Sequence, residues 1–181
     1  MVSPGNYKIG PANGRLTLCT FREGMAAVVG HDLVIDITRW QGTVSVPQEP
    51  GGRPQLDVEI DMGSFEVREG LRGVKPLTDG DRQEIKGQIA ETLRTSNYKR
   101  ASFESRTVRI QGDGATVDGQ FTLVGGTHPL RITVQAKDDR TFTGKAVVQQ
   151  TAWGIKPYKA FLGALKVRDT VEIEATVTLA G

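Results

Sequence analysis

The sequence predicts an all-β protein, an eight-stranded antiparallel closed β-barrel with one amphipathic helix, at about 81–94, packed at one end. Three observations lead to this fold class. Apolar and polar residues alternate with a period of two in eight separate segments. Clusters of Gly, Pro, Asn and Asp separate most of these segments. Only one segment changes to helical spacing, which favours a single helix in a chain of strands.

The eight segments each show one apolar and one polar face. Leu56, Val58 and Ile60, for example, alternate with Asp57 and Glu59. Sheets built from such strands are antiparallel, because parallel sheets are covered on both faces. The predicted strands are 14–22, 33–46, 55–67, 101–111, 115–124, 129–137, 140–149 and 169–179.

Turn chemistry defines most of the connections. Gln111–Gly114 and Asp138–Asp139 predict tight hairpins, and a turn at Gly125–Gly126 is expected before the strand that Pro129 opens. The segment 47–54 contains three prolines and two glycines, so we expect an exposed loop there. Within the strand 101–111 the apolar residues change parity, which predicts a β-bulge near Arg106.

The helix is predicted from a start signal and an apolar stripe. Asp81 followed by Glu84 is a variant of the capping box. Ile85, Ile89 and Leu93 recur every four residues and therefore share one face. A single stripe of this kind needs an apolar surface to lie on, and the mouth of a barrel supplies one.

A closed barrel is the natural arrangement for eight strands that each have one apolar face. Closure hides these faces and removes the edges of the sheet. An eight-stranded barrel is either filled by side chains or holds one ligand. The inward residues are mostly Leu, Ile, Val and Ala, and aromatic residues make up only 6% of the chain, which favours a cavity.

Composition excludes several classes of protein. The 181 residues fit one domain, 1–181, and the net charge of +2 comes from basic and acidic residues that are mixed along the chain. Such mixing gives no basic face for nucleic acid. No apolar run is long enough to cross a membrane as a helix. Cys19 is the only cysteine, which excludes a disulfide within the chain, and the first residues lack the apolar core of a secretory signal. We therefore expect a cytoplasmic protein.

Catalytic and metal chemistry find little support in the sequence. His31 and His128 are the only histidines, and zinc sites need about three or four closely spaced ligands. No phosphate-binding loop, dinucleotide fingerprint or serine-nucleophile motif is present. We expect no catalytic residue, metal or cofactor. His128 is expected in a turn with a structural role. His31 starts a strand at the barrel rim, beside the apolar segment 24–30, and fits a structural or gating role.

A long connection, 149–165, follows the seventh predicted strand. It carries Trp153, Tyr158 and Phe161, with Lys156 and Lys159 between the rings. Loops of this length are usually functional or mobile. One interpretation is a lid whose rings close over a cavity, and the other is a self-packed loop that covers the end of the barrel. The sequence leaves both open.

Several motifs resemble those of the YceI-like family, and together they span nearly the whole chain. The segment Gly119–Leu130 reads G-x-F-T-L-x-G-x-T-x-P-L, like the central hairpin of that family. Residues 98–105 resemble the Y-P-x-x-x-F-x-S segment that follows the helix, with Lys99 in place of the usual proline. Trp153–Ile155 and Asp169–Ile173 resemble the two closing motifs.

The resemblance implies a lipocalin-like barrel that binds a hydrophobic ligand, an isoprenoid lipid such as a polyprenol or quinone, without catalysis. Dimers occur among similar proteins, so a homodimer is a further expectation. Each buried methylene contributes about 0.8 kcal/mol to such binding. The alternatives are a ligand-free scaffold or interaction module with a filled barrel, and an enzyme with His31 as base. The residues expected to contact the ligand are Leu18, His31, Ile35, Ile37, Leu56, Val58, Ile60, Phe103, Phe121, Leu123, Ile132, Val134, Trp153, Tyr158, Phe161, Ile173 and Val177.

Overall fold

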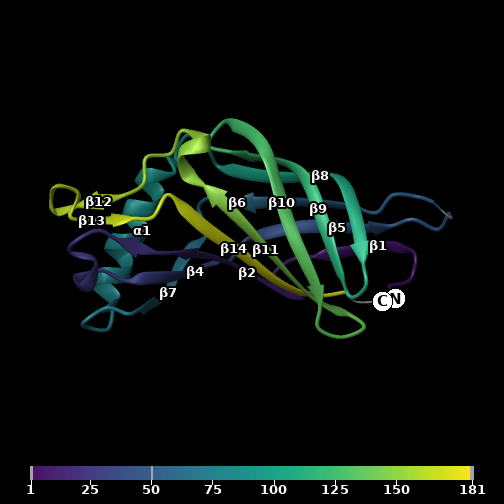
Figure 1. Ribbon diagram of the computed structural model, residues 1–181, viewed down its shortest axis with the longest axis horizontal. Helices are drawn as coiled ribbons and strands as arrows, with labels where there is room; N and C mark the ends of the chain where they lie inside the picture. Colours follow the sequence, from purple (N-terminus) through teal and green to yellow (C-terminus); the bar gives the residue numbers. More distant parts are fainter. Residues whose placement is uncertain (1, 50, 180–181) are drawn as a thin grey trace.

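The computed structural model describes residues 2–49 and 51–179, and Pro50, within the loop expected at 47–54, lies outside them. A large antiparallel sheet forms most of the molecule (Figure 1). Its eleven strands are β1 (Gly5–Ile9), β2 (Gly14–Thr20), β4 (Asp32–Ile37), β5 (Trp40–Val46), β6 (Gln55–Asp61), β7 (Phe65–Leu71), β8 (Arg100–Gln111), β9 (Gly114–Leu123), β10 (Gly126–Ala136), β11 (Thr141–Gln149) and β14 (Thr170–Thr178).

The strands follow the order β1-β5-β6-β8-β9-β10-β11-β14-β2-β4-β7, and every pairing is antiparallel. A second sheet contains β12 (Lys159–Ala160), β13 (Leu165–Val167) and β3 (Arg22–Glu23). The described residues also form three short 3-10 helices, namely η1 (Ala27–Val29), η2 (Gln150–Trp153) and η3 (Phe161–Gly163). The predicted antiparallel all-β class is confirmed.

The prediction of an eight-stranded closed barrel is wrong. The large sheet curls into a half-barrel whose outermost strands are β1 and β7, and no ladder joins these two strands within the described residues (Figure 1). The predicted strands 33–46 and 55–67 are each broken into two, because the chain bends at 38–39 and again at 62–64. The amide of Thr38 donates to the Ser64 carbonyl at 2.9 Å, so the two corners are joined.

The corners explain the open architecture. Before its corner, β4 pairs with β2, and after it β5 pairs with β1 and β6. Likewise β6 pairs with β8, whereas β7 pairs with β4. The two halves of each bent strand therefore belong to opposite ends of the curled sheet, and β1, which the alternation analysis missed, extends one of these ends.

One local prediction, the β-bulge, is confirmed, and two predictions about the next hairpin are wrong. The ladder between β8 and β9 shifts register between Ser105 and Thr107, which is the bulge expected near Arg106. The turn after β9 is Val124–Gly125, both with positive φ, and not Gly125–Gly126, because Leu123 pairs with Gly126. β10 consequently begins at Gly126, and His128 lies in this strand instead of a turn.

The helix α1 (Asp79–Thr92) connects β7 to β8 and packs against β7, at the end of the sheet away from both termini (Figure 1). Lys86 forms an ion pair with Glu66 of that strand. The capping box consists of Thr78 and Asp81, so the predicted pair of Asp81 and Glu84 is wrong by one turn. None of the helices in the described part of the chain has the length and apolar character needed to cross a bilayer.

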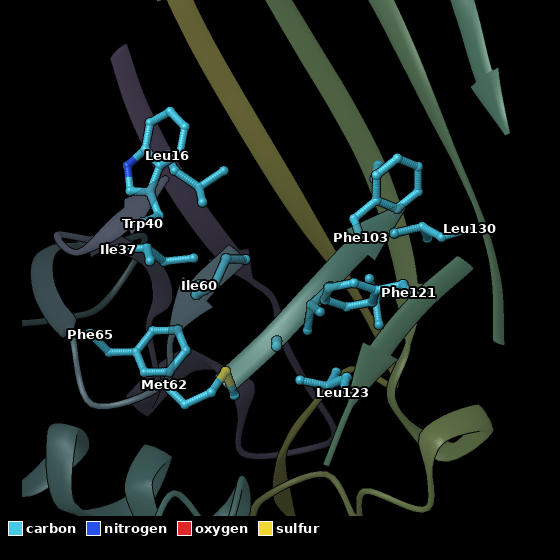
Figure 2. Close-up of a cluster of buried hydrophobic side chains, with 14 of the residues drawn as sticks. Leu16, Ile37, Trp40, Ile60, Met62, Phe65, Phe103, Phe121, Leu123 and Leu130 are labelled. Carbon is cyan, nitrogen blue, oxygen red and sulfur yellow. The ribbon is translucent and has the colours of Figure 1, made fainter. Parts of the chain in front are cut away.

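Large buried side chains occupy the end of the sheet near the termini. Figure 2 shows Leu16, Trp40 and Phe103 pointing inward there, whereas Met62 and Phe65 point inward nearer to α1. Inward glycines make room for large side chains: a Cβ on Gly119 would lie 2.4 Å from the Phe103 ring. On Gly14 it would lie 2.8 Å from Val177 and 3.2 Å from Trp40. This half of the half-barrel is filled by its own residues.

Candidate functional site

A cavity of about 580 Å³ occupies the half of the half-barrel next to α1. Strands of the large sheet form its wall, one face of α1 closes its side, and three loops surround its opening. We call these loops, residues 21–31, 70–77 and 154–168, the mouth loops. The volume falls within the ~300–1,000 Å³ that is typical of small-molecule sites.

The wall of the cavity is almost entirely apolar. Every lining residue from the large sheet has an apolar side chain except Thr20. The apolar wall consists of Leu18, Leu33, Ile35, Ile37, Ile60, Phe65, Ala101, Phe121, Leu123, Val148, Val171 and Ile173. A deep wall of this kind cannot satisfy a buried charge or polar group, and it favours hydrocarbon.

The helix supplies the side of the cavity. Ile85, Ile89 and Leu93 line it, as their shared stripe predicts, and they also pack on the buried core. Glu84 and Gln88 line it as well. The apolar stripe of α1 is narrow, so the polar residues beside it lie at the margin of the opening.

The N-terminal cap fixes where this helix begins. The Thr78 hydroxyl accepts from the Asp81 amide at 3.1 Å, and the Thr78 amide donates to Asp81 Oδ2 at 2.8 Å. The Thr78 hydroxyl also donates to the same oxygen. These bonds, that from the backbone amide first, lower the pKa of Asp81 below its ordinary value. Both residues lie at the margin of the cavity.

His31 holds two of the mouth loops together. Its Nε2 donates to the Lys75 carbonyl at 2.7 Å, which fixes this nitrogen as the protonated one. The ring lies over two glycines: a Cβ would meet His31 at 2.8 Å from Gly70 and at 2.0 Å from Gly73. The imidazole lines the cavity, but the structure gives it a positioning contact with backbone.

The charges beside His31 are also engaged in holding the mouth. Arg22 Nη1 donates to the Gly30 carbonyl at 2.8 Å and to the Val28 carbonyl at 3.3 Å. Asp32 is buried, accepts from the Arg22 amide at 2.9 Å and pairs with Arg72 at 3.4 Å. These contacts shape the rim and leave the interior of the cavity uncharged.

The connection 149–165 was interpreted either as a lid over the cavity or as a self-packed loop, and each interpretation fits one part of it. Trp153 is buried outside the cavity, donates from Nε1 to the Phe121 carbonyl at 3.1 Å, and packs edge-on against Phe121 and His128. Tyr158 and Phe161 line the cavity, and Phe161 is largely exposed. The first part of the connection is therefore self-packed, and the second part borders the opening.

The structure brings together only some of the residues expected to contact a ligand. Those that line the cavity are Leu18, His31, Ile35, Ile37, Ile60, Phe121, Leu123, Tyr158, Phe161 and Ile173. Those that pack in the core instead are Leu56, Val58, Phe103, Ile132, Val134, Trp153 and Val177. Sequence alternation marks a residue as inward, but the cross-barrel neighbour decides whether it meets a cavity or a side chain.

Sequence reasoning missed a second group of lining residues. Met62 and Phe65 flank a corner, and Leu165 and Val167 come from the small sheet. The helix residues had a usable signal, since their apolar stripe had to face something. Nothing in the sequence marks Ala101, a small residue whose inward position leaves space in the wall.

The site has the chemistry of a binding pocket with one apolar and one polar end. The charged lining residues are Arg22, Lys75, Asp81, Glu84 and Lys166, and all come from the mouth loops or α1. No group of three potential metal ligands occurs in residues 2–49 and 51–179. The arrangement suits a molecule with a hydrocarbon body inside and a polar group at the opening.

Comparisons with known proteins agree with this architecture. The YceI-like domain model matches residues 7–179. The crystal structure of BcnA from Burkholderia cenocepacia is similar, with a TM-score of 0.66 and 17% identity over 95% of this chain and 99% of that one. The YCEI protein of Campylobacter jejuni gives a TM-score of 0.52 and 12% identity over 78% of this chain and 83% of that one. At these identities the likeness shows the fold alone. A search of curated proteins finds no match.

Proposed function

Because this chain belongs to the YceI-like domain family, we propose that it is a non-enzymatic binder of an isoprenoid lipid, a polyprenol or quinone, held in the cavity beside α1. The family and the fold support a hydrophobic ligand-binding protein in general terms. The isoprenoid identity of the ligand is our inference from the family resemblance and from the shape of the site.

One observation carries the proposal: a cavity of about 580 Å³ whose sheet-derived wall is apolar apart from Thr20. Transfer of a hydrocarbon chain into it stabilises the complex by about 0.8 kcal/mol per buried methylene. A chain of about twenty carbons offsets the several kcal/mol that association costs. The filled half beyond Phe103 sets the depth that such a chain reaches.

The polar end of the ligand belongs at the mouth. Lys75, Lys166 and Glu84 border the opening, whereas the interior offers no charged partner. A hydroxyl, quinone or phosphate group therefore stays in water among these side chains. The hydrogen bond from His31 Nε2 to the Lys75 carbonyl supports a structural role for this residue.

Extraction of the purified protein with organic solvent, followed by mass spectrometry, tests the proposal. We expect a stoichiometric isoprenoid in the extract. The delipidated protein should then bind geranylgeraniol, a C20 isoprenoid alcohol, more tightly than palmitate. Preferential binding of palmitate would reassign the ligand to acyl chains, and an empty extract with no binding of either probe would favour the scaffold alternative.

A further inference from the structure

The mouth loops carry most of the strongly exposed apolar side chains. Met25 is 96% exposed and Leu162 is 110% exposed relative to a free residue. The exposed apolar residues of these loops are Met25, Val28, Val29, Leu71, Val74, Phe161 and Leu162. Elsewhere in the part of the chain that the structure describes, only Ile110 and Val147 belong to this class. A concentration of exposed apolar side chains at one end of a molecule marks an interaction surface.

The three loops form one surface around the opening of the cavity. The Ala26 amide donates to the Ala164 carbonyl at 2.8 Å, which joins the first loop to the third. His31 joins the first loop to the second through the Lys75 carbonyl. All three lie at the end of the molecule opposite the termini (Figure 1).

The backbone at the tip of the third loop exposes its apolar residues at a conformational cost. Phe161 has φ of 49° and Leu162 has φ of 54°, in the left-handed region that large L-residues rarely adopt. This conformation leaves both side chains in water instead of folding them onto the protein. Strain that produces exposure of this kind points to a use of the exposed groups.

Positive charge accompanies the apolar tips. The mouth loops contain seven Lys and Arg residues and one carboxylate, Glu23, in a chain whose net charge is only +2. Glu23 pairs with Lys166 at 3.1 Å. Among the described residues, no ion pair involves Lys75, Lys156 or Lys159, and all three are exposed. The surface is therefore both apolar and cationic.

We propose that the mouth loops dock the protein on an anionic lipid bilayer. The apolar tips enter the interface, and the lysines lie over the anionic headgroups, each contributing to the attraction. Separate protruding tips suit a fluid lipid surface, which adapts to them. A structured protein partner would need a surface whose shape is complementary to all of the tips. This inference rests on the proposed function in one respect: docking places the cavity opening against the membrane, so that a lipid enters without crossing water.

Sedimentation of the full chain with large unilamellar vesicles tests the proposal. We expect binding to vesicles of phosphatidylcholine with 30% phosphatidylglycerol at low salt, and much weaker binding to phosphatidylcholine alone or at 0.5 M NaCl. The affinity of the variant M25S/L162N for these vesicles should be lower by at least about tenfold, because the variant removes two inserted apolar side chains. Asn tolerates the positive φ at position 162, and neither residue lines the cavity.

The matched control is I110T/V147T, which removes the two exposed apolar residues outside the mouth loops and should bind vesicles like the unchanged protein. K156Q/K159Q should bind anionic vesicles about thirtyfold more weakly, because each of the two lysines contributes about 1 kcal/mol to the attraction. Absence of vesicle binding, equal binding to neutral vesicles, or equal losses in M25S/L162N and the control would overturn the proposal. A concentration-dependent dimer that M25S/L162N abolishes, without vesicle binding, would assign the tips to a second copy instead.

The two proposals fail separately. Binding of geranylgeraniol in the absence of vesicles measures the cavity alone, and M25S/L162N should retain it. Vesicle docking without any bound or extractable lipid would refute the proposed function and leave the docking surface in place.

Discussion

The substitution Ala101→Trp gives a direct test of the cavity as the ligand site. Ala101 lies on β8 opposite Ile60, is 1% exposed, and lines the cavity wall. A tryptophan at this position projects into the open volume of about 580 Å³. It therefore takes the place of bound hydrocarbon, with little need to displace neighbouring side chains.

The expected loss of affinity follows from buried area. An aromatic side chain of this size buries about 200 Å². If the ligand loses contact over the same area, the binding free energy falls by about 5 kcal/mol at ~25 cal/mol per Å². This corresponds to a loss of between three and four powers of ten in affinity. Overpacking a filled core lowers the free energy of unfolding by ~1–3 kcal/mol. The loss for A101W should be smaller, because the tryptophan fills empty space.

Equilibrium dialysis of delipidated protein against radiolabelled geranylgeraniol measures the affinity, and circular dichroism checks the fold. Ala90→Trp is the matched control, because Ala90 lies on the exposed face of α1 and does not line the cavity. It should bind the probe like the unchanged protein. A folded A101W that binds within about threefold of the unchanged protein would refute the assignment of the cavity as the site.

Three further predictions concern the parts of the structure around the cavity. Phe103→Ala should lower the free energy of unfolding in urea by about 3–5 kcal/mol, yet leave geranylgeraniol affinity within a few-fold, because Phe103 is buried in the filled half; a large loss of affinity would place it in the site. Thr78→Ala should cost about 1 kcal/mol through the lost helix cap. Since folding lowers the pKa of Asp81, the stabilisation from its carboxylate is present above the unfolded pKa of about 3.9 and is lost as pH falls through the lower folded value. The difference in urea midpoint between Thr78→Ala and the unchanged protein should therefore narrow as pH falls below about 4, and a constant difference would count against the bond from the Thr78 hydroxyl to Asp81. Gly73→Ala would put a Cβ 2.0 Å from His31 Nε2. The NMR signal of the Nε2 proton, which is hydrogen-bonded to the Lys75 carbonyl, should therefore shift or vanish, and an unchanged signal would contradict the packing of this ring.

The strands and the helix were largely predictable because they depend on local spacing. Strand residues such as Val171 and Ile173 alternate with glutamates, and their side chains lie on one face as expected. The parity change near Arg106 correctly revealed a bulge. These features need only the geometry of one segment and its nearest neighbours.

The corners had the same kind of signal, which the closed-barrel interpretation passed over. The buried residues change from odd to even between Ile37 and Trp40, and from even to odd between Met62 and Phe65. Applied at these positions, the parity argument used for Arg106 would have split both predicted strands. The pairing of each half with a different end of the sheet is a long-range property that no local pattern encodes.

The division of the interior into a filled half and a cavity was not predictable from alternation. Phe103 and Phe121 both point inward, on paired positions of neighbouring strands, but only Phe121 lines the cavity. Gly119 makes the difference, because its missing side chain admits the Phe103 ring. Alternation in the sequence identifies Gly119 as an inward residue. It does not identify the side chain that fills the space beside this glycine, because that side chain comes from another strand.

Methyl NMR of isoleucine-labelled protein, titrated with geranylgeraniol, tests the central claim most directly. The isoleucines sample both halves of the interior: Ile35, Ile89 and Ile173 line the cavity, whereas Ile9 and Ile132 belong to the core outside it. We predict large shifts and ligand cross-peaks for the first three methyl groups and none for the other two. Saturable binding with cross-peaks to Ile9 and Ile132 instead, or no shifts at the cavity wall, would contradict the account.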